Sequence, residues 1–108
     1  MDHVSDIDIL NTIGEPAVLE QLAEEASELS QAASKMARFI RQENPTPKSE
    51  SECFADLIEE YTDVINCIQI LDIKFNEYML RDKRARWKYR IYDGYRKNDK
   101  EDKIKYTI

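Results

Sequence analysis

Two short acidic clusters are the residues of this chain whose type and spacing suit chemistry. The first is Glu24-Glu25-Ala26-Ser27-Glu28 and the second is Glu59-Glu60-Tyr61-Thr62-Asp63. A helix turns by about 100° per residue, so two acids three positions apart lie on neighbouring rows of one flank. Two ionised side chains at this spacing repel each other unless a positive group lies between them. Each cluster therefore predicts either a solvated helix face or a site for a cation.

The two clusters repeat one spacing beside the apolar stripes of two predicted helices. Helical projection places Glu25 and Glu28 on one side of their stripe, and Glu60 and Asp63 on the matching side of theirs. If the stripes pack antiparallel, four carboxylates face one another across a groove, where protonation or a hard divalent cation would relieve their repulsion. Mg²⁺ suits this all-oxygen set best, with Mn²⁺ as an alternative. A di-iron carboxylate site is disfavoured because it needs Glu-x-x-His on two helices, and the sole histidine is His3.

A basic segment farther along the chain carries the charge that a phosphate ligand needs. Lys83, Arg86 and Arg90 recur at i, i+3 and i+7 of a predicted helix and so share a face. Arginine forks and lysine ammonium groups neutralise phosphate oxygens that a metal ion leaves uncovered. Trp87 suits either stacking on a base or packing in a core or interface.

The charge of the chain is divided unevenly along the sequence. The net charge is −6, but residues 1–73 hold 16 acidic and 4 basic side chains, whereas residues 74–108 hold 6 acidic and 12 basic ones. This division suits a ligand that carries both a metal ion and phosphate, and it equally suits simple attraction between the two halves. A nucleic-acid-binding protein is more often basic throughout, so we expect no nucleic-acid partner.

Three helices are expected to position these groups, over about residues 16–42, 52–74 and 77–92. The first has an apolar stripe at spacings of three and four, formed by Leu19, Leu22, Ala26, Leu29, Ala33, Met36 and Ile40. The stripe of the second consists of Phe54, Leu57, Ile58, Tyr61, Val64, Ile65, Ile68 and Leu71. Asn76 is expected to cap the third helix after a tight turn, and Gly94 is expected to end it.

The segments around these helices contain further capping and breaking signals. Ser5 is expected to cap a short turn that stops before Gly14. Two prolines disfavour helix in the linker over residues 43–47, after which Ser49 or Ser51 can cap the next helix.

The composition indicates an all-α fold. Hydrophobic residues make up 42% and charged residues 35% of the chain, with two Gly and three Pro. We expect an antiparallel helical bundle that forms a single domain over residues 1–93, followed by a polar tail over residues 94–108. No apolar run approaches a membrane span and no signal peptide is evident, so a cytoplasmic protein with no membrane partner is expected. Cys53 and Cys67 are too far apart along one helix to bridge and are expected to be reduced core thiols.

The expected helices also predict self-association. Helices of this size bury limited surface within one chain. Tyr78, Trp87, Tyr89 and Tyr92 present more aromatic surface than one terminal helix would hide. A homodimer or homotetramer is therefore expected.

The paired acidic motifs resemble those of a known family. Glu24-Glu25-x-x-Glu28, followed 31 residues after Glu28 by Glu59-Glu60-x-x-Asp63, is similar to the EExxE and ExxD signature of the MazG-like all-α nucleoside triphosphate pyrophosphohydrolases. The resemblance extends over about residues 18–92. It includes Leu22-Ala23-Glu24-Glu25, Asp63-Val64-Ile65 and Lys83-x-x-Arg86-Trp87-x-x-Arg90-Ile91.

The resemblance implies an oligomeric helical bundle that converts a nucleoside or deoxynucleoside triphosphate to the monophosphate and pyrophosphate with Mg²⁺. It implies the metal ligands Glu25, Glu28, Glu60 and Asp63. Catalytic roles are implied for Glu24 and Glu25, although Glu24 projects away from the apolar stripe, which also suits a residue that faces solvent. Charge on the departing pyrophosphate would be balanced by Lys83, Arg86, Arg90 and Lys35. A non-catalytic helical interaction module and a nucleotide sensor that does not cleave remain the alternatives.

Overall fold

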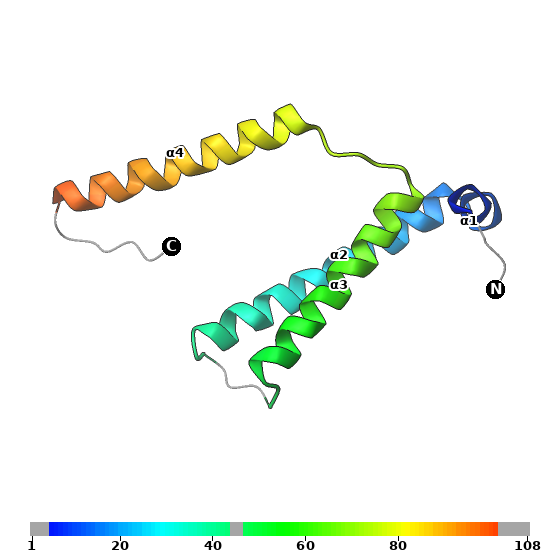
Figure 1. The fold of residues 1–108 in the computed structure, drawn as a ribbon, viewed down its shortest axis with the longest axis horizontal. Coiled ribbons are helices and arrows are strands. Elements are labelled where there is room, and N and C mark those ends of the chain that lie inside the picture. Colours follow the sequence, from blue (N-terminus) through cyan, green and yellow to red (C-terminus); the bar gives the residue numbers. More distant parts are fainter. Residues whose placement is uncertain (1–4, 44–46, 102–108) are drawn as a thin grey trace. The chain divides into compact units, whose positions relative to one another are not determined.

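The computed structural model describes residues 5–43 and 47–101 of the chain, with side chains described as far as Gly94. These residues form the helices α1 (Asp6–Ile13), α2 (Glu15–Ile40), α3 (Glu50–Ile70) and α4 (Glu77–Glu101), and they contain no strand (Figure 1). The expectation of an all-α protein is confirmed. The chain divides into two compact units, Met1–Ile73 and Lys74–Ile108, in contrast to the single domain expected over residues 1–93.

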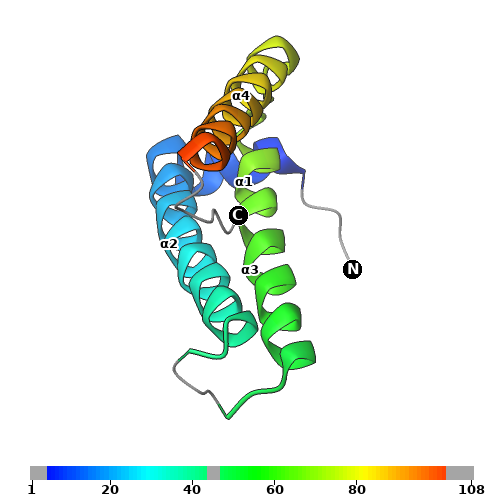
Figure 2. The same cartoon turned by 90° about the vertical axis from the view of Figure 1, so that its left-hand side faces the viewer.

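Helices α2 and α3 form an antiparallel hairpin in the first unit (Figure 2). Its packed face, here called the seam, consists of buried and half-buried side chains that alternate at spacings of four and three. On α2 the seam is Val18, Leu22, Glu25, Leu29, Ala32, Met36 and Phe39. On α3 the seam is Cys53, Leu57, Glu60, Val64, Cys67 and Leu71. This is the heptad spacing of helices that pack side by side.

The seam differs from the stripes expected from the sequence. Leu19 and Ile40 of the expected α2 stripe are 44% and 62% exposed, and Phe54, Ile58 and Tyr61 of the expected α3 stripe are about half exposed. These side chains, together with Ala26 and Ala33, form a second apolar row one residue after the seam, here called the outer row. Each helix thus carries two adjacent apolar rows. The expected stripes were partly wrong because they included outer-row residues, whereas the hairpin buries the seam, the row that contains Glu25 and Glu60.

Helix α1 covers the end of the hairpin that lies away from the α2–α3 loop. Ile9 and Leu10 pack against a buried cluster of Val18, Cys67 and Ile70, together with Leu22 and Leu71. Ser5 caps α1 through a capping box with Asp8, so the expected short turn is a helix of 8 residues. Gly14 separates α1 from α2. Its φ is 88°, a backbone conformation that would be strained in a residue with a side chain.

The ends of α2 and α3 are set by local hydrogen bonds. Ser49, rather than Ser51, caps α3: its hydroxyl accepts the Glu52 amide, and the Glu52 carboxylate accepts the Ser49 amide at 2.9 Å. Both helices end in a left-handed residue, Gln42 after α2 and Asp72 after α3. The amides that follow return to helical carbonyls, as in a Schellman motif, so the helices stop at residues 40 and 70.

The second unit contains α4. Asn76 caps it as expected, since the side-chain oxygen of Asn76 accepts the Met79 amide at 2.9 Å. The expectation that Gly94 ends this helix, leaving a tail from residue 94, is wrong: α4 continues through Gly94 to Glu101. A glycine within a helix costs only about 1 kcal/mol relative to alanine, so it does not by itself stop a helix.

Two other expectations concern the cysteines and the membrane. Cys53 and Cys67 are buried free thiols, which confirms their assignment to the core. In the described part of the chain, none of the helices meets the length and hydropathy that a membrane span requires.

Candidate metal centre

Glu25 and Glu60 occupy seam positions that are otherwise filled by apolar or small side chains. On α2, Leu22 and Leu29 flank Glu25 along the seam, and on α3, Leu57 and Val64 flank Glu60. Both acids are half-buried. Placing a carboxylate in a packed seam is unfavourable unless its charge is neutralised or its oxygens are bonded, so these two positions are exceptional in the hairpin.

The two seam acids converge with a third carboxylate. Glu25, Glu60 and Asp63 each present one oxygen, and these oxygens lie within 4.8 Å of one another. The Oε2 atoms of Glu25 and Glu60 are buried, and neither has a hydrogen-bond partner among the described residues. Gln21 Nε2 donates a hydrogen bond of 2.8 Å to the other carboxylate oxygen of Glu25, Oε1. The cluster therefore combines an oriented carboxylate with unsatisfied oxygens.

The electrostatics of the cluster favour an added positive charge. The pKa of the Glu60 carboxyl is raised, first by desolvation, then by a hydrogen bond with Glu28 and by repulsion from Glu28, Asp63 and Glu25. Desolvation also raises the pKa of the nearby Cys67 thiol, with smaller contributions from Glu25 and Asp63. Cys67 is thus a protonated thiol at neutral pH, which leaves oxygen as the donor of this site.

The donor set fits a hard divalent cation. Carboxylate oxygens are the ligands that Mg²⁺ and Mn²⁺ prefer. Mg²⁺ binds them at about 2.0–2.1 Å, so modest side-chain movements would bring the three oxygens into one coordination shell. The buried Oε2 atoms of Glu25 and Glu60 lack partners among the described residues, and a cation bound at the cluster would offer them one.

The other predicted acids lie around this cluster. Glu28 is exposed, lies one turn after Glu25, and is close enough to Glu60 to raise the pKa of its carboxyl. The hairpin thus brings three of the four predicted metal ligands within 4.8 Å of one another, and Glu28 lies beside Glu60 outside this group. Glu24 is exposed on α2 and does not belong to the converging group, in agreement with its projection away from the apolar stripe.

A groove of about 570 Å³ runs from this cluster toward the α2–α3 loop. The predicted phosphate ligand Lys35 lines it with Glu28 and Glu60. Two further charged residues of the groove, Lys48 and Asp56, were missed by the sequence analysis, and they form an ion pair with each other. Lys48 lies in the loop just before α3, and Asp56 lies eight residues later within α3. Their contact depends on the path of the loop, so it is visible only in the folded structure.

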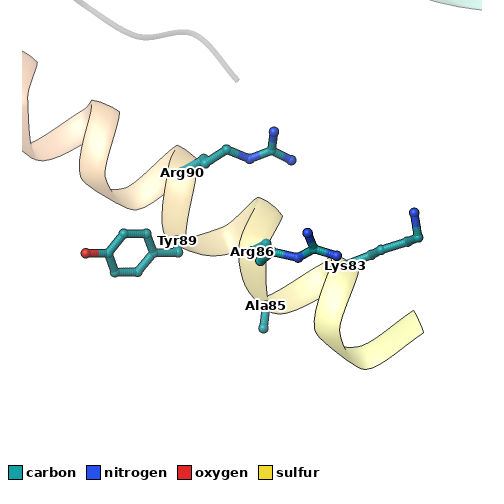
Figure 3. Close-up of a pocket in the computed structure, with 5 residues that line it drawn as sticks. All are labelled: Lys83, Ala85, Arg86, Tyr89 and Arg90. Carbon is teal, nitrogen blue, oxygen red and sulfur yellow. The ribbon is translucent and has the colours of Figure 1, made fainter. Parts of the chain in front are cut away.

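The predicted cations of the basic segment lie on α4, in the second unit. Lys83, Arg86 and Arg90 share a face as expected and line one hollow, together with Ala85 and Tyr89 (Figure 3). Arg86 also pairs with Asp82 one turn earlier, at 2.9 Å. Trp87 is 64% exposed within the described chain.

Comparison of this chain with models of known protein families, with curated proteins and with solved structures finds no match. The geometry of the site and the resemblance of the acidic motifs are therefore the grounds for a functional proposal.

Proposed function

We propose that this protein is a Mg²⁺-dependent nucleoside triphosphate pyrophosphohydrolase, which also accepts Mn²⁺ as its metal. The observation that carries the proposal is the pair of seam acids, Glu25 and Glu60, whose buried Oε2 atoms lack partners among the residues that the structure describes. Such an arrangement lowers stability unless a cation is bound, so its presence in the packed face favours a functional role. The acidic motifs, similar to those of the MazG-like family, point to a nucleotide as the ligand of that cation.

In the proposed reaction, water adds to the α-phosphorus and the bond from this phosphorus to the bridging oxygen breaks. Pyrophosphate leaves with the bonding electron pair, and the proton of the water passes to a carboxylate, for which Glu24 and Glu25 are the candidates. A bound divalent cation polarises phosphate oxygens and lowers the pKa of water. Glu25, Glu60 and Asp63 would hold the cation, while Gln21 orients Glu25 and the neighbouring Glu28 helps to raise the pKa of Glu60.

Pyrophosphate release from a panel of NTPs and dNTPs, measured with and without Mg²⁺, tests this proposal. Glu60→Gln should lower kcat/KM by about 100-fold or more, because the amide cannot supply a negative ligand. Glu59→Gln is the matched control: Glu59 is the exposed neighbour on α3, and its loss of charge should change kcat/KM by less than about twofold. Absence of Mg²⁺-dependent turnover on every nucleotide would contradict the proposal.

A helical interaction module is the second candidate, and the outer row favours it. Seen along the hairpin axis, the next residue after a seam position is rotated in opposite directions on α2 and on α3, because the two helices run antiparallel. The outer rows of both helices therefore face the same side of the hairpin. Glu28 and Asp63, three residues after the seam acids, turn to the other side. The hairpin thus has an acidic face and an exposed apolar face, and apolar faces of this kind mark association.

The same outer row supports the proposal of a homodimer or homotetramer. Tyr61→Arg should dissociate the oligomer, because Tyr61 lies in the outer row, 53% exposed, and a charge there cannot be buried between copies. Light scattering at micromolar concentration measures the change, with Glu59→Arg as a control outside the row. A monomeric native protein would contradict self-association.

A nucleotide sensor is a further alternative to the pyrophosphohydrolase. Mg²⁺-dependent binding of a nucleotide without turnover would identify it.

A further inference from the structure

The groove beside the acidic cluster changes in charge along the hairpin. Its α2 wall contains Glu28, Gln31 and Lys35, which follow one another on a single face. Lys35 lies seven residues after Glu28, which is two helical turns or about 10 Å closer to the α2–α3 loop. The acidic end of the groove therefore lies at mid-hairpin and its cationic end lies near the loop.

The opposite wall of the groove adds a second lysine at the same end. Lys48 lies just before α3 and is paired with Asp56, one helical turn before Glu60. The pair holds the side chain of Lys48 at the wall and leaves this side chain 49% exposed. Lys35 is also exposed, and both residues line the same groove. The two lysines thus lie on opposite walls at the loop end of the groove, next to a predicted cation site.

We infer that the groove binds a polyphosphate in one direction, with the phosphate nearest the nucleoside at the acidic cluster and the terminal phosphates at Lys35 and Lys48. This inference rests on the proposed function and adds to it the orientation of the substrate. The nucleoside then lies on the α1 side of the cluster, and pyrophosphate leaves toward the loop. The phosphate tail is held by residues of the first unit alone.

The chemistry of the walls supports this direction. Phosphates bound to Mg²⁺ keep negative oxygens that the metal does not cover, and lysine ammonium groups neutralise such oxygens as point charges. The reverse direction would place terminal phosphates beyond the cluster, away from both lysines. It would also leave Lys35 and Lys48 without a role in binding the departing group.

Calorimetric titration of the full chain with inorganic tripolyphosphate in the presence of Mg²⁺ tests the inference without requiring turnover. Lys35→Met and Lys48→Met should each weaken binding about tenfold, whereas binding of AMP should be unaffected. Lys88→Met, an exposed lysine on α4 outside the groove, is the matched control and should leave both affinities unchanged.

Asp56→Asn separates binding from a merely structural role of the ion pair. It removes the carboxylate that pairs with Lys48 in the groove but keeps the ammonium group, so tripolyphosphate should bind as well as or better than it does to the native protein. Equal weakening by Asp56→Asn and Lys48→Met would overturn the inference, as would unchanged binding in both lysine variants.

Turnover measured in parallel separates this inference from the proposed function. Cleavage of an NTP with lysine-independent tripolyphosphate binding would contradict the inference alone. Lysine-dependent binding without cleavage of any NTP would contradict the pyrophosphohydrolase and support the groove as a polyphosphate site.

Discussion

The two halves of the α2–α3 seam follow the same heptad spacing but bury different chemistry. Next to α1, the seam residues Val18 and Cys67 pack with Ile70 in an apolar cluster. Farther along, the seam positions are held by Glu25 and Glu60, whose buried Oε2 atoms have no hydrogen-bond partner in the described part of the chain. The first half stabilises the hairpin through burial, whereas the second lowers its stability in the absence of a bound cation. Equivalent positions of one helix pair thus serve folding next to α1 and a candidate site at mid-hairpin.

The largest change in stability is expected in the apolar half. Ile70→Ala removes buried atoms from the cluster and should lower the free energy of unfolding by about 2–4 kcal/mol. Urea denaturation monitored by circular dichroism measures this loss. Thr62→Ala, at an exposed position of the same helix, is the control. If the two variants unfold at similar urea concentrations, the cluster does not stabilise the hairpin.

The acidic half should respond to an apolar substitution in the opposite direction. Without divalent metal, Glu60→Leu should raise Tm, because it replaces a repelling carboxylate by a side chain that suits the seam. Mg²⁺ should raise the Tm of the native protein, and the same variant should lose this rise. Differential scanning calorimetry measures both effects. A lower Tm without metal would show that Glu60 stabilises the hairpin by itself.

A smaller effect is expected in the pH dependence of the metal-free protein. The folded-state pKa of Glu60 is raised, so its protonated form favours the folded chain, and this contribution is lost as pH rises through the raised pKa. Glu60→Gln resembles the protonated form at every pH. The two proteins should have similar Tm below the ordinary glutamate pKa, and the native protein should become the less stable one above its raised pKa.

The comparison with Glu60→Gln isolates this group from others that titrate in the same range. Glu52 has a lowered pKa because the Ser49 amide and hydroxyl bond to its carboxylate, and it therefore stabilises the fold at higher pH. That contribution is common to both proteins and cancels in the difference between their Tm values. A difference that does not change with pH would contradict the raised pKa of Glu60. Saturating Mg²⁺ at neutral pH should reverse the sign of the difference.

Much of the local structure could be predicted from short-range chemistry. The hydroxyl of Ser49 and the amide oxygen of Asn76 act on backbone groups three residues away, so a capping signal can be read without tertiary contacts. The spacing of Glu25, Glu28, Glu60 and Asp63 likewise follows from helical geometry. The end of α4 could not be predicted, because a glycine such as Gly94 weakens a helix by an amount that its neighbours can offset.

By itself, the sequence determined that the chain is helical, where most helices begin, and which acids can share a helix face, because these depend on contacts within a few residues. Only the tertiary structure decided which of two adjacent apolar rows is buried. That choice requires the partner helix, since both rows are apolar and lie about 100° apart on each helix. It places Glu25 and Glu60 within the seam rather than beside it, and it brings Lys48 to the same groove as Lys35.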